Sequence, residues 1–482
     1  MQARSKLLRS MDTFLRSCSA ALKRSEEEGS AVHVVLGNEA CDLDSMVSAI
    51  TFAYFLAKTS AKTPKTLIPV LNIPRSELPL RTEGTYFLRE NGIAEESLVL
   101  RDEVDLHALH RAGQLLLTLV DHNVLPGADS VLEGAVVEVV DHRPLERAPS
   151  AGCAVTSEPV GSCATLIAER IARSAPHVLD KQVAALLYGT IVLDCVNMAP
   201  EAGKVTPKDR ELVALLESKF TNLPQRATLF ESLQRAKFNV AGLSTEQMLQ
   251  KDMKAVGGDD VTVAISGVYM RLEAFLQRSG LQQELCEFCH KHRHAALVAM
   301  TISFSDGNQP YRQIAVYSYS TRLREQLCQA LENSQNPHLN LSPIASPYPH
   351  IKAYHQGNTL ASRKKVLPII KEFLRERERA VHAGTGGEEL EDQFDSSCRT
   401  PPPEEEARHH RYSASRRRRQ AAEDSGTEED SQLPPTPMNS LVEGCPLDTG
   451  LPRLTADAIL EKFSRMAKEE ENWGERDLPS GQ

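Results

Sequence analysis

The chain has 482 residues, enough for two or three domains with a sizeable core, so its stability does not require disulfide bonds. Its formal net charge of −10 argues against nucleic acid as the main partner but permits local basic sites for an anionic substrate. The ten cysteines lack a framework spacing, and no apolar run approaches 18 residues, so we expect reduced thiols, no secretion signal and no membrane span. These features predict a cytoplasmic protein.

The first half of the chain has the pattern of an α/β domain. Residues 1–30 have helical periodicity and form an N-terminal helical segment, and beyond them short apolar runs alternate with helical patterns. Strands that are apolar on both faces are typical of a parallel sheet covered by helices. We therefore predict a doubly wound, mostly parallel sheet over 31–228, closed by a helix and connector within 201–228.

The second half has a mixed pattern. Helical periodicity over 245–254, 272–292 and 363–380 alternates with strand-like runs, which predicts a smaller α+β domain over 229–382. Residues 383–482 combine blocks of charge with Pro and Ser, and have little to bury. We expect this tail to be disordered, with one amphipathic stretch at 454–470 that is able to fold on a partner.

Four apolar runs each end in an acid or an imidazole. The run AVHVVL is followed by GNEACDLDS, and the other three end in VDHN (120–123), VDHR (140–143) and LDCVN (193–197). If these runs are strands of one parallel sheet, their carboxyl ends meet at one edge and the polar groups converge. Oxygen and nitrogen ligands without paired cysteines suit one or two divalent cations such as Mg²⁺ or Mn²⁺.

Each of these acids also has an ordinary structural interpretation. Asp42 or Asp44, for example, could cap the helix that follows it, since Asp is favoured at helix N-termini. Four such segments together make capping alone the weaker explanation.

The order of GNEACDLDS, VDHN, VDHR and LDCVN resembles the four motifs of the DHH phosphoesterase superfamily. The similarity is to the branch that includes the family II inorganic pyrophosphatases and the eukaryotic exopolyphosphatases. GNTLASRKKVLP (357–368) resembles the Ser-Arg-Lys-Lys signature of that branch's DHHA2 domain, and KDMK (251–254) resembles its lysine-bearing segment. The resemblance implies a metal-dependent hydrolase of short inorganic polyphosphates, with cyclic-nucleotide phosphodiesterase activity as the alternative.

The resemblance also implies a site with two ions, Mn²⁺ or Mg²⁺, that activate a water molecule between them. Its ligands would be Asn38 and Asp42 on one ion, Asp44, His142 and Asp194 on the other, and Asp121 bridging both. Asp121, His122 and Arg143 are the candidate catalytic residues. The substrate phosphates would be bound by Arg143 together with Lys254, Arg363 and Lys364 from the second domain.

Two positions depart from the pyrophosphatase pattern. Asn38 stands where those enzymes carry a histidine, and Asp141, His142 and Arg143 stand where they carry Asp-His-His. An amide oxygen is a weaker ligand than imidazole, whereas Arg143 adds a permanent cation that can neutralise phosphate charge. We therefore expect slower turnover of pyrophosphate and a preference for short polyphosphates.

Three further motifs have competing interpretations. CEFCH (286–290) matches a haem-attachment string, but it lies in a helical pattern without a second cysteine pair. RRRR (416–419) is compatible with a nuclear signal and, more commonly, with a solvated charge run. In the tail, Thr436-Pro437 lies in a segment suited to docking, and the resemblance implies nucleoside diphosphate kinase as a partner. A regulatory interaction protein is therefore the second class of function, and the oligomeric state is left open.

Overall fold

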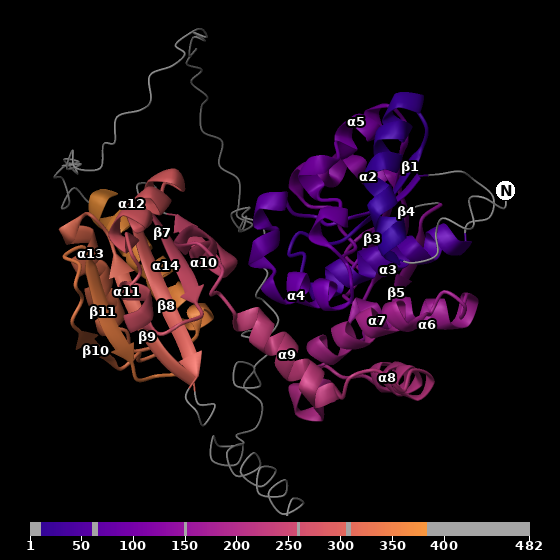
Figure 1. Ribbon diagram of the computed structural model, residues 1–482. Helices are drawn as coiled ribbons and strands as arrows, with labels where there is room; N and C mark the ends of the chain where they lie inside the picture. Colours follow the sequence, from indigo (N-terminus) through magenta and orange to yellow (C-terminus); the bar gives the residue numbers. More distant parts are fainter. Residues whose placement is uncertain (1–10, 60–65, 149–151, 258–260, 305–309, 383–482) are drawn as a thin grey trace, which may run out of the picture.

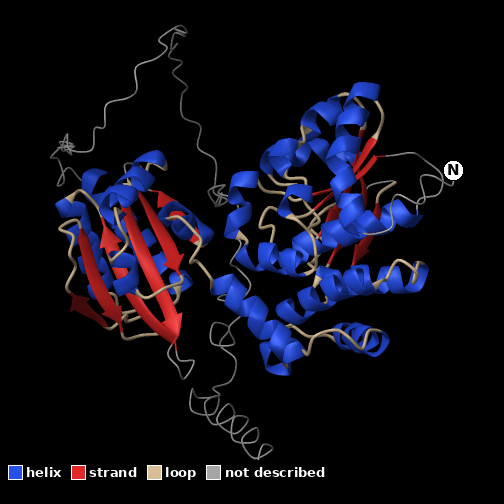
Figure 2. Cartoon of the chain, viewed as in Figure 1, coloured by secondary structure: helices blue, strands red, loops and turns tan. Residues whose placement is uncertain are grey.

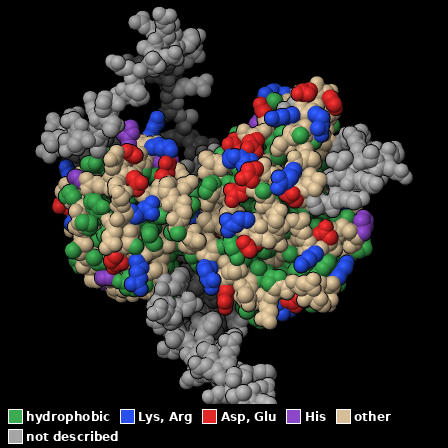
Figure 3. All heavy atoms as spheres, in the orientation of Figure 1, with side chains coloured by type: hydrophobic (Ala, Val, Ile, Leu, Met, Phe, Trp, Pro, Cys, Tyr) green, Lys and Arg blue, Asp and Glu red, His purple; other side chains and the backbone are tan. Residues whose placement is uncertain are grey.

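The computed structural model describes residues 11–59, 66–148, 152–257, 261–304 and 310–382, which form two units side by side (Figure 1). The predicted tail over 383–482 and the first ten residues lie outside the described residues. Among the helices that are described, none combines the length and the apolar composition that crossing a bilayer requires. On the face shown in Figure 3, acidic and basic side chains are interspersed, without a broad basic surface in that view.

A five-stranded sheet in the order β2-β1-β3-β4-β5 forms the centre of the first unit. Every strand pair in it is parallel, as predicted. Its strands are β1 (Val32–Leu36), β2 (Thr66–Val70), β3 (Leu115–Val120), β4 (Val136–Asp141) and β5 (Ala154–Ser157). The central strands are buried on both faces, which explains why they read as continuous apolar runs.

Helices cover this sheet, as Figure 2 shows in blue around red. They are α2 (Met11–Glu28), α3 (Leu43–Thr59), α4 (Thr82–Glu90), α5 (Leu106–Arg111), α6 (Cys163–Ser174), α7 (Lys181–Asp194) and α8 (Pro207–Lys219). Short 3-10 helices connect them: η1 (Arg75–Leu80), η2 (Glu95–Ser97), η3 (Arg101–Glu103), η4 (Gly127–Ala135), η5 (Val196–Met198) and η6 (Pro200–Ala202). Helix α3 packs against β1, β2, α6 and α7, so it lies at the centre of the unit.

The fourth apolar run is not a strand. It forms the end of α7, and Asp194 is the last residue of that helix. Asp180 is the N-cap of this helix, and its side chain accepts a hydrogen bond from the Val183 N–H. Because α7 is buried along nearly its whole length, its sequence is apolar on every side, and periodicity cannot distinguish such a helix from a buried strand.

The second unit contains a mixed six-stranded sheet in the order β10-β11-β9-β8-β7-β6, which confirms the predicted α+β class. Its strands are β6 (Met253–Gly257), β7 (Thr262–Val268), β8 (Ala296–Phe304), β9 (Pro310–Tyr317), β10 (Leu341–Ile344) and β11 (Ile351–Gln356). Only the β7–β8 pair is parallel among these described strands. Along β7, Val263 and Ile265 enter one hydrophobic core while Ala264 enters the other, so both faces of the sheet are covered.

The helices of the second unit are α10 (Thr245–Lys251), α11 (Leu272–Leu276), α12 (Leu281–Lys291), α13 (Thr321–Glu332) and α14 (Arg363–His382). Two predicted helices differ from these. The helix expected over 245–254 ends at Lys251, so Lys254 lies on strand β6, and the helix expected over 272–292 is divided at Gly280, where φ is 73°. Helix α9 (Arg226–Phe238) lies between the units, and the predicted boundary at 228/229 falls inside it.

Asp209 fixes the start of α6, which borders the candidate site. This carboxylate is fully buried and accepts hydrogen bonds from the Gly161 N–H (2.9 Å), the Thr165 hydroxyl (2.6 Å) and both the N–H and hydroxyl of Thr206 (2.7 Å each). A Cβ at Gly161 would lie 2.4 Å from Cys195 Sγ, so only glycine fits this approach. The segment leading into α6 is therefore held against α8.

Replacing Asp209 with Ala should lower the free energy of unfolding by about 3 kcal/mol, because four donors lose their acceptor. Asp105→Ala is the matched control, since it removes an exposed N-cap of α5 that accepts from Ala108 and should cost about 1 kcal/mol. Urea unfolding followed by circular dichroism measures both changes. Equal losses in the two variants would show that Asp209 is no more than an ordinary helix cap.

Candidate metal centre

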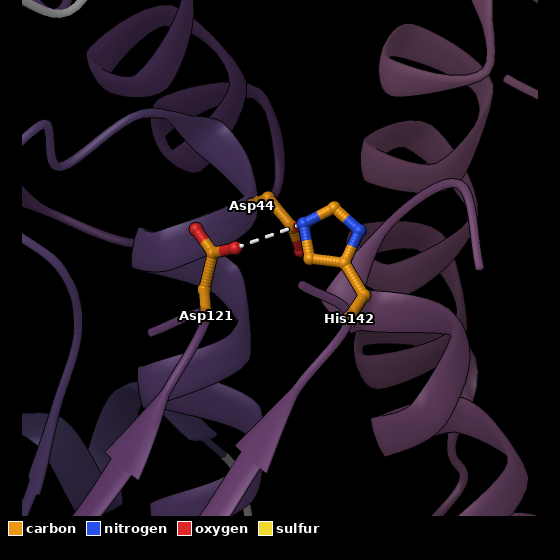
Figure 4. Close-up of side chains that lie close together, drawn as sticks. All are labelled: Asp44, Asp121 and His142. Carbon is orange, nitrogen blue, oxygen red and sulfur yellow. Dashed lines mark ion pairs between the residues drawn. The ribbon is translucent and has the colours of Figure 1, made fainter. Parts of the chain in front are cut away.

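Asp44, Asp121 and His142 point toward one another at the carboxyl edge of the parallel sheet (Figure 4). Asp121 follows β3 directly, His142 follows β4, and Asp44 is the second residue of α3. One ligand atom from each of the three lies within 4.8 Å of the others. His142 Nε2 is 3.2 Å from Asp121 Oδ1 and 4.0 Å from Asp44 Oδ2. Adjacent parallel strands therefore bring these groups together, as the sequence predicted for two of the four runs.

A tight turn after β1 places the acids of the first motif. A Cβ at Gly37 would lie 2.2 Å from Ser45 Oγ, so glycine is required for the chain to fold back on α3. The Asn38 N–H donates to Ser45 Oγ (2.8 Å), and Asp42 Oδ1 accepts from the Ser45 N–H (3.1 Å). Asp42 therefore does cap α3, the ordinary interpretation considered for it above.

Asp44 caps a different helix from its own. Its Oδ2 accepts from the Cys163 N–H (2.6 Å) and its Oδ1 from the Ala164 N–H (2.8 Å), while Ser162, at the N-cap position of α6, makes no capping bond. The N-terminus of α6 thus supplies hydrogen bonds and the positive end of a helix dipole to this buried carboxylate. These donors fix the position of the Asp44 carboxylate beside the other acids.

His142 is oriented by the backbone. Its Nδ1 is 2.9 Å from the Val160 carbonyl, an acceptor, so Nδ1 carries a proton and Nε2 faces Asp121. Burial lowers the pKa of His142, but Asp121 and Asp44 outweigh it and raise this pKa to about 10. A hydrogen bond that fixes one ring nitrogen and leaves the other directed at carboxylates is the usual arrangement of a metal-binding histidine.

Asp121 carries the clearest sign of an absent partner atom. It is 1% exposed and has a φ of 61°, in the left-handed region that few residues other than glycine adopt. Its buried Oδ1 accepts no hydrogen bond from the described residues, although His142 Nε2 and Arg143 Nη1 each form an ion pair with it at 3.2 Å. Burial together with the charge of Asp44 raises the pKa of Asp121 to about 7. A divalent cation would satisfy this oxygen and the facing imidazole nitrogen together, so the residues present fit such an ion.

The other three predicted ligands border this cluster. Asn38 Nδ2 donates to Asp121 Oδ2 (2.8 Å), while Asn38 Oδ1 accepts from the Cys41 N–H (3.0 Å), so a ligand role would require the amide to turn over. Asp194 lies close enough that burial and the charges of Asp44 and Asp42 raise its pKa well above the usual value. Burial and the charge of Asp44 likewise raise the pKa of Asp42.

The two remaining catalytic candidates lie beside Asp121. Arg143 Nη1 donates to the Asp121 carbonyl, is 3.2 Å from Asp121 Oδ1, and its side chain is 44% exposed. It therefore faces both the acids and the solvent, where a phosphate would enter. The His122 side chain is buried; its Nδ1 is held by the Val120 carbonyl (3.0 Å), and burial lowers its pKa, which keeps the ring neutral.

Apart from Arg143, the predicted substrate-binding residues come from the second unit. Lys254 lies on β6 and pairs in register with Ile265, and Lys364 is exposed near the start of α14. Arg363, the first residue of α14, donates to Asp252 Oδ1 (2.6 Å), and its buried Nε has no hydrogen-bond partner among the described residues. The sequence analysis missed Asp252, although it stands within the KDMK string.

Asp141 was also not among the predicted site residues. It accepts hydrogen bonds from Asn123 Nδ2 (2.6 Å) and the His142 N–H (2.8 Å), and so fixes the end of β4. In the sequence, only Asn123 of the VDHN motif hinted at this hydrogen bond to Asp141. CEFCH lies in α12, as expected, and within the described ranges no second group of metal-ligating side chains accompanies the Asp44–Asp121–His142 cluster.

Both units of the chain match known protein families. The family model "DHH family, N-terminal domain" matches residues 33–191, and the DHHA2 domain model matches residues 231–373. Exopolyphosphatase PRUNE1 of Mus musculus is 50% identical over 466 residues, covering 95% of this chain and 97% of that protein.

Two archaeal proteins are more distant. A manganese-dependent inorganic pyrophosphatase of Methanocaldococcus jannaschii is 25% identical over 228 residues, which are 46% of this chain and 66% of that protein. The crystal structure of a putative family II inorganic pyrophosphatase from Methanococcus jannaschii aligns with a TM-score of 0.41 at 20% identity, covering 71% of this chain and all of that one. From the identity to PRUNE1 over nearly the whole chain and the two matched domains, we conclude that the chain belongs to the DHH and DHHA2 phosphohydrolase family that includes the PRUNE1 exopolyphosphatases.

Proposed function

We propose that the chain hydrolyses short inorganic polyphosphates from their ends, with two divalent cations, Mn²⁺ or Mg²⁺, at the Asp44–Asp121–His142 cluster and its neighbours. The observation that carries the proposal is the buried, unbonded Asp121 Oδ1 facing His142 Nε2 at 3.2 Å. The substrate class is supported by the name of the PRUNE1 relatives, and the choice of metal by that of the manganese-dependent relative.

Each residue has a separate task in this reaction. Asp44, Asp121, His142 and Asp194 would hold one ion, and Asn38 and Asp42 the other, with Asp121 shared between them. When bound, such a pair of cations lowers the pKa of a water molecule and stabilises charge on the attacked phosphoryl group. The Val160 carbonyl holds the His142 ring, and the N–H groups at the start of α6 hold the Asp44 carboxylate in place.

The basic residues would bind the phosphate chain. Arg143 keeps its charge throughout the reaction and, being half exposed beside Asp121, can pair with the phosphoryl oxygens. Lys254, Arg363 and Lys364 would hold the phosphates farther along the chain. Because Asn38 and Arg143 replace two imidazoles of the pyrophosphatase pattern, the proposal includes weaker binding of one ion and slow turnover of pyrophosphate.

Interaction and localisation belong to the same proposal but rest on the sequence alone. The tail segment 433–454 is proposed to bind a nucleoside diphosphate kinase, and the protein to reside in the cytoplasm, with RRRR (416–419) permitting a nuclear fraction. Neither role depends on the metal cluster, so a variant without hydrolysis should still capture the kinase.

Phosphate release from pyrophosphate, tripolyphosphate and a cyclic nucleotide, measured side by side with Mn²⁺, Mg²⁺ or chelator, ranks the candidate reactions. We expect tripolyphosphate to be hydrolysed at least about ten times faster than the other two, and chelator to abolish the reaction. Faster hydrolysis of the cyclic nucleotide would favour a phosphodiesterase instead.

Replacing Asp121 with Asn keeps the shape of the side chain but removes its charge. We expect turnover of tripolyphosphate to fall by about 1,000-fold or more, equivalent to about 4 kcal/mol of barrier, because the shared carboxylate is lost. Asp102→Asn, an exposed carboxylate of the same unit, should retain full activity. If the Asp121 variant kept more than a tenth of the wild-type rate, Asp121 would not be a shared metal ligand. If this variant no longer captured the kinase, hydrolysis and kinase binding would not be separate functions.

Stabilisation by Mn²⁺ should increase with pH. The pKa values of Asp121 (about 7) and His142 (about 10) are raised in the folded chain. These two side chains therefore lose their protons at a higher pH in the folded chain than in the unfolded chain. This contribution to stability is present at low pH and is lost as pH rises, from about 4 to 7 for Asp121 and from about 6.5 to 10 for His142. Mn²⁺ must displace the same protons when it binds. Its affinity should therefore rise about tenfold for each unit increase in pH and each proton released.

Thermal unfolding with and without Mn²⁺ at pH 6 and pH 8 measures this effect. We expect a clearly larger rise in Tm at pH 8. An equal rise at both values would place the ion away from Asp121 and His142.

A further inference from the structure

The two units meet at a buried group of charged side chains, which we call the interdomain charge cluster. Its members are Arg81 and Glu83 at the start of α4, Lys237 on α9 and Lys251 at the end of α10. Their exposed fractions are 2%, 2%, 1% and 1%. Charged side chains are rarely buried to this extent unless specific partners compensate them, so the cluster calls for a functional explanation.

Lys251 crosses from the second unit into the first. Its Nζ donates to the Leu80 carbonyl (2.6 Å) and to the Thr82 hydroxyl (2.9 Å), and it lies 3.8 Å from Glu83 Oε2. The Thr82 hydroxyl in turn donates to the Lys237 carbonyl (3.2 Å). The last residue of α10 is therefore bonded to the last residue of η1 and to the first residue of α4.

The start of α4 also contacts the candidate metal centre. Arg81 lies between the two residues that bind Lys251, and its Nε donates to the Ala40 carbonyl (3.1 Å). Ala40 belongs to the loop that carries Asn38 and Asp42. The same short segment thus holds the second unit on one side and the metal-binding loop on the other.

On the second-unit side, the residues after Lys251 carry the proposed phosphate-binding groups. Asp252 accepts from Arg363 Nη2 (2.6 Å) and from the Tyr269 hydroxyl (2.9 Å), and Lys254 follows two residues later. Gly267 packs against this carboxylate so closely that a Cβ there would lie 2.4 Å from Asp252 Oδ2. The position of Lys251 therefore sets the position of both Arg363 and Lys254.

From this chain of contacts we propose that Lys251 is a positioning residue, which fixes the phosphate-binding cations of the second unit relative to the metal-binding loop of the first. The inference rests on the proposed function for the identity of the substrate. Lys251 touches neither ion nor phosphate; it acts through Leu80, Thr82 and the KDMK segment. Its loss should weaken phosphate binding without changing the affinity for metal ions.

Lys251→Met tests the proposal, because it keeps an unbranched apolar stem close to the length of the lysine stem and removes the three polar contacts of Nζ. In the full chain, we expect the KM for tripolyphosphate to rise at least about tenfold with a kcat change below about threefold, since the displaced cations bind substrate and transition state alike. The Kd for imidodiphosphate, a non-hydrolysed probe, should rise by the same factor in calorimetry with Mn²⁺ present. The Kd for Mn²⁺ alone should stay within about twofold of wild type.

Three further variants make the result decisive. Lys251→Arg keeps the charge and donors and should restore most of the probe affinity, and Lys291→Met, on the exposed surface of α12, should leave it unchanged. Thr82→Val removes one acceptor from the opposite unit and tests the same link if Lys251→Met does not fold. Combined with Lys251→Met, its effect should be less than additive.

Wild-type affinity for imidodiphosphate in both Lys251→Met and Thr82→Val would overturn the proposal, as would parallel losses of Mn²⁺ and probe affinity. Because the probe is not hydrolysed, its binding is informative even if the wild-type chain failed to cleave polyphosphate. Failure of the proposed function and failure of this inference are therefore distinguishable.

Discussion

Repulsion among buried carboxylates is the constraint on which the rest of the site depends. Burial and the charge of neighbouring acids, above all that of Asp44, raise the pKa values of Asp42, Asp121 and Asp194. The fold offsets this cost only in part. Asp44 has the N-terminus of α6, whereas Asp121 Oδ1 has ion pairs at 3.2 Å with His142 and Arg143 but accepts no hydrogen bond from the described residues. A group of buried carboxylates that repel one another is unfavourable by itself, and a bound cation would neutralise their charge.

The surrounding structure can be understood as support for that arrangement. The parallel sheet brings Asp121 and His142 to neighbouring strand ends, and the turn at Gly37 brings the start of α3 against them. Asp209 holds α6 in place, so its N–H groups stay directed at Asp44. The interdomain charge cluster extends this support to the second unit, which presents the basic groups that an anionic substrate would need. Under the proposed function, the first unit would bind the metal ions and the second would contribute most of the phosphate-binding cations.

Much of this could be predicted from the sequence. Apolar runs ending in VDHN and VDHR identified the ends of β3 and β4, because strand ends in a parallel sheet share an edge. Asp194 was assigned to a strand end and lies instead at the end of α7, since a helix buried on all sides has no amphipathic period. Lys254 was predicted to lie on a helix. That helix ends at Lys251, and Lys254 lies on strand β6.

Other features depend on contacts that no local pattern reveals. The helix that Asp44 caps begins 119 residues later in the chain, so its capping role is visible only in the folded structure. Arg81, Glu83 and Lys251 read as ordinary surface charges in the sequence, because such residues are usually exposed. Their burial appears only when the two units pack together. The sequence therefore indicated the chemistry of the site. The tertiary structure was needed to show which charged side chains are buried and which groups bind them.

The central claim is that Asp44, Asp121 and His142 share a divalent cation. Crystals of the full chain grown with Mn²⁺, with data collected at the manganese absorption edge, test it most directly. The account predicts an anomalous peak about 2.0–2.3 Å from Asp121 Oδ1 and His142 Nε2, with the Arg143 guanidinium moved away from Oδ1. Absence of a peak there at saturating Mn²⁺, with Arg143 still paired to Asp121, would contradict the claim.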